Sequence, residues 1–404
     1  MHFNWLALVV PLFVLATVIE YIVAKRRGMQ VFHLSETMAN ISVGIGERLL
    51  DVFVTGLFFF VYRYLHQHFG VFNIRPSILL WVALLFVTDF VWYWYHRLAH
   101  EINLFWAVHV VHHQSSDFNY TASARITVFQ ALLRSAFWAI LPILGFPPMM
   151  ISSMLIVHGL YPFFIHTQTI GKLGVLEYIL VTPSHHRVHH ASNDTYLDKN
   201  YGDMFIIWDK LFGTFIKEDD AQKPVYGLTK PLNSYNFLWQ HFHFFIEIWI
   251  ACKKQKGFRN KWKVLFGAPS GFDASAREKA EQVFGIVQHD GEEKPPLNMY
   301  VLWQIGLSLV ALFFFLWYAH QIPLLQQWII TITLLITLVN CGAILEQKQW
   351  VLRLEIIRAS VIVLACMIVW PGNSLIILLL VACILLRYYS SINHQYLKWV
   401  YAKI

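Results

Sequence analysis

The chain has few charged residues for its length. Only 14% of its 404 residues are Asp, Glu, Lys or Arg, whereas 57% are hydrophobic. A soluble globular protein carries about 25% charged residues, which keep its surface hydrated. The shortage of charge therefore excludes an ordinary soluble protein of this size. It indicates that lipid solvates much of the surface.

Cysteine is also scarce and forms no motif. The four cysteines, Cys252, Cys341, Cys366 and Cys383, are scattered and contain no CxxC pair. Their spacing argues against a disulfide framework and against cysteine-ligated metal. The sequence lacks the HExxH motif of zinc proteases. It also lacks the interleaved basic and aromatic residues that would indicate a nucleic-acid partner.

Long apolar runs, by contrast, are abundant. A helix needs about 20 apolar residues to cross a bilayer, because each residue adds about 1.5 Å. We expect nine such segments: 4–24, 42–65, 77–95, 127–145, 149–166, 299–319, 324–344, 355–371 and 374–390. The fourth and fifth are joined by LGFPP and form either two crossings or a re-entrant or kinked pair. The predicted fold class is an all-α integral membrane protein.

The order of these runs divides the chain into three regions. We expect a membrane-embedded catalytic domain in residues 1–250 and a four-span membrane bundle in residues 299–404. Residues 251–298 are polar and are interrupted by the motifs APSG and GEEKPP, so we expect them to form a cytoplasmic linker. The C-terminal runs have no ionisable residues recurring at helical spacing, which favours a lipid-facing or stabilising role.

Histidine carries the predicted chemistry. Three clusters, HxxxH, HxxHH and HxxHH, use the spacing of one helical turn. Residues three or four apart lie on one face of a helix, so we expect each cluster to direct its imidazoles to one point. A lone histidine is usually structural, but three such clusters in one chain indicate a metal site. The cluster histidines are His96, His100, His109, His112, His113, His186, His189 and His190.

The number of imidazoles predicts two metal ions. A catalytic zinc takes about three protein ligands, so eight imidazoles exceed the need of one ion. We expect two metals with four or five nitrogens each. Neutral imidazole suits zinc, copper, iron and nickel. A pair of redox metals at a membrane indicates oxygen chemistry on a lipid. Iron is therefore our prediction, although the spacing alone leaves zinc open.

Charge predicts where the clusters lie. Lys25, Arg26 and Arg27 follow the first apolar run, and basic residues near span ends stay on the cytoplasmic side. Counting crossings from there places all three clusters on the cytoplasmic face of a bacterial inner membrane or the endoplasmic reticulum. A metal transporter is the alternative, but it would hold its ligands near the bilayer midplane. Here they follow the predicted span ends.

The sequences around the clusters carry a resemblance. Residues 89–125, with HRLAHEINLFWAVHVVHH, and 176–215, with PSHHRVHHASNDTYLDKNYGDMFIIWD, resemble the fatty acid hydroxylase and sterol desaturase superfamily. Within it they resemble the alkylglycerol monooxygenase family, over roughly residues 80–235. The resemblance implies a di-iron enzyme that uses O2 and tetrahydrobiopterin, although no pterin motif is visible. It would hydroxylate the alkyl carbon next to an ether oxygen, and the hemiacetal would release a fatty aldehyde and the glycerol derivative.

The identity of the lipid stays open at this stage. The histidines define the oxidant and not the carbon that it attacks, so a hydroxylase or desaturase of a sterol, fatty acid or carotenoid is the alternative. The resemblance also implies iron ligation by the eight cluster histidines and by His166. His158 departs from the family's amide and is either a tenth ligand or a hydrogen-bond donor to one. His185 has a supporting or structural role.

Three polar residues near the clusters are candidates for catalytic support. Asp89 lies two helical turns before His96 in an apolar run, and a carboxylate there needs a partner. We expect Asp89 to meet Arg97 or the N–H of a ligand. Glu101 is a candidate bridging ligand or hydrogen-bond partner of a ligand. Asn119 is a weaker candidate, for which a turn is the equal alternative.

Overall fold

The computed structural model describes residues 4–286, 298–348, 350–369, 383–384, 387–395 and 398. The structure is 70% helical, and the described residues form no strand, only two isolated β-bridges. The all-α fold class is therefore confirmed. Short 3-10 turns connect the helices. Besides η2 (Val110–His113), which carries two of the clustered histidines, they are η1 (Trp5–Leu8), η3 (Ala122–Ala124), η4 (Gly174–Tyr178), η5 (Pro269–Gly271) and η6 (Ala319–Gln321).

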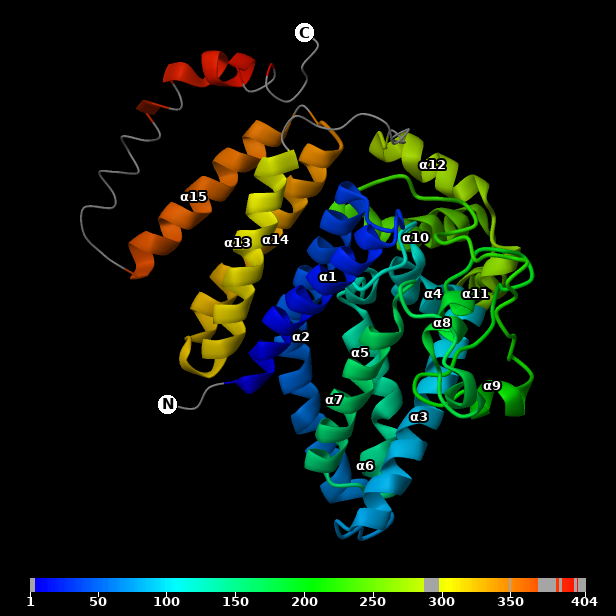
Figure 1. The fold of residues 1–404 in the computed structure, drawn as a ribbon. Coiled ribbons are helices and arrows are strands. Elements are labelled where there is room, and N and C mark those ends of the chain that lie inside the picture. Colours follow the sequence, from blue (N-terminus) through cyan, green and yellow to red (C-terminus); the bar gives the residue numbers. More distant parts are fainter. Residues whose placement is uncertain are drawn as a thin grey trace.

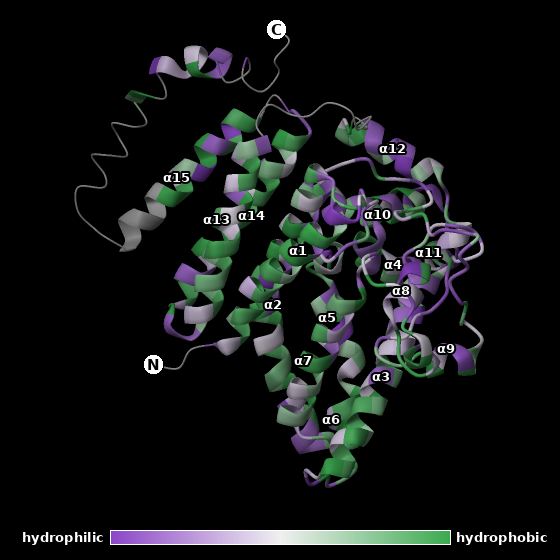
Figure 2. Ribbon diagram, viewed as in Figure 1, coloured by the Kyte–Doolittle hydropathy of each residue, from purple (hydrophilic) through white to green (hydrophobic). Residues whose placement is uncertain are grey.

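Five described helices are long and apolar enough to cross a membrane, in agreement with a multi-pass membrane protein. Each matches one of the predicted runs, and their apolar residues are visible along the helices in Figure 2. They are α1 (Val9–Arg26, extended by η1), α3 (Ile78–Glu101), α7 (Pro148–Ile165), α13 (Asn298–Tyr318) and α14 (Leu324–Leu345).

Four predicted runs differ from the structure or lie partly outside it. Run 42–65 belongs to α2 (Leu34–Phe69), which has 36 residues, about 54 Å, and is not among the five candidate spans. Run 127–145 forms two short helices, α5 (Gln130–Trp138) and α6 (Ile140–Leu144). Run 355–371 lies mostly in α15 (Val351–Val369), and run 374–390 lies largely outside the described residues.

The turn between α6 and α7 explains why the fourth and fifth runs form a kinked pair. Gly145 has φ +102°, and a Cβ there would lie 1.9 Å from the carbonyl oxygen of Phe72. Only glycine fits this backbone without strain. The chain then re-enters a helix at Pro148, the first residue of α7. Figure 1 shows α6 and the lower ends of α3 and α7 gathered at one tip of the molecule.

The histidine-bearing elements gather at the opposite end of these helices. They are α4 (Asn103–His109), η2 (Val110–His113) and α8 (Pro183–His189), with α9 (Ile207–Phe212) beside them. The Nη1 of Arg27, just after α1, donates to the carbonyl of Thr169 at 2.6 Å. The ends of α1 and α7 therefore lie together, at the end of the molecule where the basic cluster of residues 25–27 stands.

The C-terminal helices are packed against the rest of the chain. A buried core includes Ile45 and Leu49 of α2 together with Ile305 of α13 and Leu338 of α14. The described part of the predicted linker is also helical. It contains the end of α10 (Phe237–Lys254), followed by α11 (Phe258–Phe266) and α12 (Ser275–Phe284). The boundaries of the three regions remain a proposal.

Candidate metal centre

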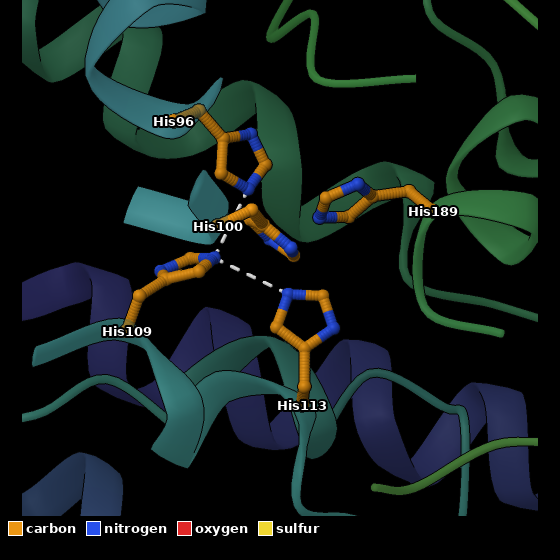
Figure 3. A group of neighbouring side chains, drawn as sticks. All are labelled: His96, His100, His109, His113 and His189. Carbon is orange, nitrogen blue, oxygen red and sulfur yellow. Dashed lines mark hydrogen bonds between the residues drawn. The ribbon is translucent and has the colours of Figure 1, made fainter. Parts of the chain in front are cut away.

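Nine histidines from four stretches of the chain, residues 96–100, 109–113, 166 and 186–190, converge into two groups. In each group the candidate ligand atoms all lie within 4.8 Å of one another. The members of the five-histidine group are His96, His100, His109, His113 and His189. The members of the four-histidine group are His112, His166, His186 and His190. Figure 3 shows the rings of the five-histidine group turned toward a common centre.

The two HxxHH motifs are divided between the groups. His109 and His113 enter the five-histidine group, whereas His112 enters the other. Likewise His186 and His190 share one group, and His189 joins the opposite one. The expectation that each cluster serves one point is therefore wrong for both motifs. Adjacent helical residues differ by about 100° in direction, so the two adjacent histidines of each motif cannot face the same point. In both motifs the first histidine shares its group with the residue four positions on.

Backbone carbonyls orient four of these rings. In each case Nδ1 lies within hydrogen-bond distance of a carbonyl oxygen, so Nδ1 carries the proton and Nε2 keeps its lone pair. This is the arrangement that presents Nε2 to a metal. The four contacts are His96 to Tyr201 at 2.9 Å, His189 to Lys199 at 2.9 Å, His112 to Arg125 at 3.1 Å and His166 to Pro162 at 2.5 Å.

Several ring nitrogens that point into the groups have no proton donor beside them. The Nε2 atoms of His112 and His166 are 3.2 Å apart, yet both rings use their proton at Nδ1. Two lone pairs cannot form a hydrogen bond with each other, whereas a cation between them would satisfy both. In the other group, the Nε2 atoms of His100 and His189 are buried without any hydrogen-bond partner. The residues therefore fit bound metal.

Burial keeps the imidazoles neutral, as ligation requires. It lowers the pKa of His112 to about 4. The same desolvation, reinforced by neighbouring imidazoles, lowers the pKa of other candidate ligands outside the membrane spans well below the usual histidine value. These are His109, His113, His186, His189 and His190.

The two groups are direct neighbours. The ring of His113, from the five-histidine group, stacks on that of His190, from the other, with centroids 4.4 Å apart and planes at 21°. His186 and His189 stack in the same way at 5.3 Å. Two metals held by these groups would be separated only by these stacked imidazole rings and would act as one pair.

His158 does not join either histidine group. It lies on α7 in a separate buried cluster with Asp89 and Asp203, where its Nδ1 is 2.5 Å from an oxygen of Asp203. Its Nδ1 is 3.8 Å from Asp89. The expectation that His158 ligates with the cluster histidines is not met. Its buried position in the apolar helix explains why it pairs with carboxylates instead.

Asp89 has different partners from those expected. It accepts hydrogen bonds from the backbone N–H groups of Met204 and Phe205, at 2.9 and 3.2 Å, and from the Trp208 indole at 2.8 Å. Within the part of the chain that the structure describes, neither Arg97 nor the N–H of a histidine of the two groups is hydrogen-bonded to Asp89. Asp89 therefore anchors the segment that follows Tyr201, whose carbonyl orients His96.

The other predicted supporting residues stand outside the groups. Glu101 is 44% exposed and pairs with Arg97 at 2.8 Å, which contradicts a bridging role, because its carboxylate points to solvent. Asn119 accepts from the Thr121 backbone at 2.9 Å and donates to the carbonyl of Val31, so it shapes a turn. His185 caps the start of α8 through the backbone N–H of Thr182.

Sequence reasoning missed the segment that carries two of the orienting carbonyls. Lys199 and Tyr201 present them, and Asp209 holds this segment by accepting from the backbone N–H groups of Tyr201 and Gly202 at 2.7 and 2.8 Å. Every residue has a carbonyl, so no residue type marks these positions. Asp198, Asn200 and Asp209 are weaker candidates for supporting roles from the sequence, but none of them marks the carbonyls.

Comparison with known proteins agrees with this geometry. Residues 81–214, which hold both groups, match the Fatty acid hydroxylase family. The chain is 34% identical to human alkylglycerol monooxygenase over 357 residues, which cover 86% of this chain and 79% of that protein. It is 33% identical to the Xenopus tropicalis enzyme of the same name over 354 residues, covering 86% and 78%.

More distant relatives match a smaller part of the chain. An ornithine lipid hydroxylase of Rhizobium tropici is 32% identical over 146 residues, or 36% of this chain and 44% of that protein. No solved structure gives a significant match. The breadth of the first two matches, together with the paired histidine groups on apolar helices, leads to one conclusion. The chain is a membrane oxidoreductase that belongs to the alkylglycerol monooxygenase family.

Proposed function

We propose that the chain is an O2-dependent di-iron monooxygenase of ether lipids. It would hydroxylate the alkyl carbon next to the ether oxygen of an alkylglycerol. The observation that carries the proposal is the pair of neighbouring histidine groups, several of whose inward nitrogens face each other or the centre of the group without a proton donor. Family membership supports the choice of substrate, because two relatives that each match 86% of this chain bear the name alkylglycerol monooxygenase.

Each of the two histidine groups would hold one iron. Iron bound there supplies the redox chemistry that inserts one oxygen atom from O2 into a C–H bond. The carbonyls of residues 199 and 201 keep two imidazoles of the five-histidine group in the ligating tautomer. Those of residues 125 and 162 do the same in the four-histidine group. Because the rings are buried, water has little access to the reacting carbon.

The reaction needs two electrons from outside. An alkylglycerol, O2, two electrons and two protons give a hemiacetal and water. The hemiacetal then breaks its C–O bond to the glycerol, which leaves as an alcohol, and the former alkyl carbon becomes an aldehyde. Tetrahydrobiopterin is the proposed electron donor on the strength of family membership. The chain itself would bind and orient the lipid and exclude water.

The placement of the site fits a lipid substrate. His96 and His100 lie in the last two turns of the candidate span α3, and His166 directly follows span α7. The metals would therefore lie at headgroup depth, where an ether carbon lies when the glycerol stays near water. The basic residues 25–27 at the same end favour the cytoplasmic face of a bacterial inner membrane or the endoplasmic reticulum.

The test is a turnover assay with the full chain in lipid nanodiscs. An alkylglycerol, O2 and reduced tetrahydrobiopterin are supplied, and fatty aldehyde is measured. Aldehyde that requires all three components, with about two irons per chain, supports the proposal. Variant His112→Ala should give none while staying in the membrane fraction. Full activity in this variant, or zinc in place of iron, overturns the proposal.

A second candidate is a hydroxylase of another lipid. It is favoured by the matches to the ornithine lipid hydroxylase and to human lathosterol oxidase, which is 28% identical over 149 residues. Each of these matches covers only 36% of this chain. The same nanodisc assay with a sterol or an ornithine lipid discriminates the two functions. Oxidised product from these lipids, without aldehyde from alkylglycerol, would favour the second candidate.

A further inference from the structure

Helix α11 is hydrogen-bonded to the residues that follow the candidate membrane span α3. Asn103 stands two residues beyond Glu101, the last residue of α3. Its backbone N–H donates to the carbonyl of Gly267 at 2.9 Å, and its side-chain amide donates to that of Val264 at 2.9 Å. These two bonds place the C-terminal end of α11 at the depth where α3 leaves the membrane. The helix therefore lies beside the lipid headgroups.

One face of α11 is an exposed ridge of aromatic rings. Phe258, Trp262 and Phe266 are four residues apart and are 77%, 51% and 37% exposed. Neighbouring rings touch, with centroids 5.7 and 4.2 Å apart. Residues four apart lie on one side of a helix, so the ridge is continuous. Asn260 lies on the opposite side, because two residues turn the helix by about 200°.

The segment around the ridge carries only positive charge. From residue 249 to 272 it holds five lysines and one arginine and no acidic residue. Lys254 pairs with Asp273 at 2.9 Å. The other cations of residues 249–272 are exposed and form no ion pair with any residue that the structure describes. They are Lys253, Lys256, Arg259, Lys261 and Lys263.

We propose that α11 is an interfacial helix that binds anionic lipid headgroups. Its aromatic ridge would enter the headgroup layer, and the cations on its flanks would meet lipid phosphates. Tryptophan and phenylalanine on one face, with lysine and arginine beside them, are typical of helices that lie in this layer. The depth set by Asn103 favours lipid over a soluble acidic protein, because it brings the ridge against the membrane.

The test measures the exposure of single positions in the full chain. Phe258→Cys and Asn260→Cys, in a background with the four native cysteines replaced, are labelled with the dye NBD. The chain is reconstituted in vesicles of phosphatidylcholine alone or with phosphatidylglycerol, and reduction of the dye by dithionite is followed. We expect the dye at 258 to react at least about fivefold more slowly than at 260 when phosphatidylglycerol is present.

A charge variant isolates lipid recognition. Arg259→Gln, Lys261→Gln and Lys263→Gln together should remove most protection at position 258. The matched triple Lys217→Gln, Lys223→Gln and Lys279→Gln, on exposed residues outside α11, should not. Anionic-lipid binding is overturned if the dye at position 258 is protected as well in neutral vesicles as in vesicles with phosphatidylglycerol, and as well in the first triple variant as without it. Protection that appears only after a soluble acidic protein is added overturns lipid as the occupant.

A second measurement needs no cysteine replacement. Brominated phosphatidylglycerol quenches tryptophans that touch lipid, and the difference between the native chain and Trp262→Phe isolates Trp262. We expect strong quenching of that difference signal. If iodide in the water quenches it instead, the ridge faces solvent and the proposal fails.

Discussion

The Nε2 atoms of His112 and His166 face each other at 3.2 Å while the Nδ1 atoms of both rings are bonded to backbone carbonyls. His112 comes from a 3-10 turn after α4, and His166 follows α7. Without a cation, this contact would oppose two buried lone pairs, an arrangement that costs free energy. The relationship makes His166 as important as the clustered histidines, although it belongs to no cluster.

Loss of His166 should therefore resemble loss of His112. We expect His166→Ala to remove one of two irons and to lower the rate of aldehyde formation by at least about 100-fold, because ligand loss exceeds the effect of losing an orienting group. Metal analysis and the nanodisc assay measure both. His68→Ala, on an exposed residue of α2, is the control and should keep both irons. Two irons in His166→Ala would exclude ligation by His166.

The neighbours His189 and His190 should serve different metals. The double variant His186→Ala and His190→Ala damages only the four-histidine group, so about one iron per chain should remain. The double variant His189→Ala and His190→Ala damages both groups and should leave close to none. Iron content per folded chain checks this. Equal iron in the two double variants would refute the division of the HxxHH motif.

Asp203 should stabilise the fold and, through the neighbouring segment, the metal centre. Asp203→Asn leaves His158 buried without its carboxylate, which should cost about 3–5 kcal/mol of unfolding free energy. Because Tyr201 orients His96 from the same segment, iron affinity should fall about 10-fold. Melting temperature and iron titration report these. Asp220→Asn, on an exposed carboxylate, should change neither. An unchanged melting temperature in Asp203→Asn would contradict the role.

The buried imidazoles should make the metal-free fold sensitive to acid. His112 has a pKa of about 4 in the fold and 6.5 when exposed. Below pH 6.5 the unfolded chain binds the proton and the folded chain does not. Stability is therefore lost as pH falls from 6.5 to about 4, by about 1.4 kcal/mol per pH unit for each such imidazole.

Buried carboxylates oppose this effect without cancelling it. Burial raises the pKa of Asp209 to about 6 and also raises the pKa values of Glu36, Asp117 and Asp203, so each of these groups adds stability as pH falls below its folded-state pKa. The lowered imidazoles outside the spans are more numerous, because His185, His241 and His243 join six candidate ligands, so the histidines dominate. Melting temperatures of chelator-treated protein at pH 7.5 and 5.5 test the sum. His112→Gln should flatten the slope by about one proton, and a flat native profile would contradict the prediction.

Glu101 should be dispensable despite its position beside His100. Its carboxylate is exposed and bonded to Arg97, and such surface pairs contribute about 0–1 kcal/mol. We expect Glu101→Gln to keep both irons and nearly full activity. A large loss of activity at constant iron content would restore Glu101 as a catalytic candidate.

Part of this picture was readable from residue type alone. Apolar runs about 20 residues long predicted α1, α3, α7, α13 and α14, because a bilayer demands that length. Run 42–65 predicted only part of a helix, since α2 continues well beyond it. This helix also carries the buried Glu47, which is paired with Arg48. A window of hydropathy counts these charges but not their pairing with each other and, for Arg48, with Asp51 at 3.2 Å.

The same division applies to the metal centre. The sequence by itself determined the ligand type and number, because imidazoles at helical spacing in an apolar chain have few other uses. Only the tertiary structure decided which imidazole belongs to which group, which of the two groups His166 joins, and that His158 pairs with Asp203. These depend on the direction of each ring and on carbonyls supplied by distant segments. Spacing along one helix sets a direction only relative to that helix, and the packing of helices sets where the directions meet.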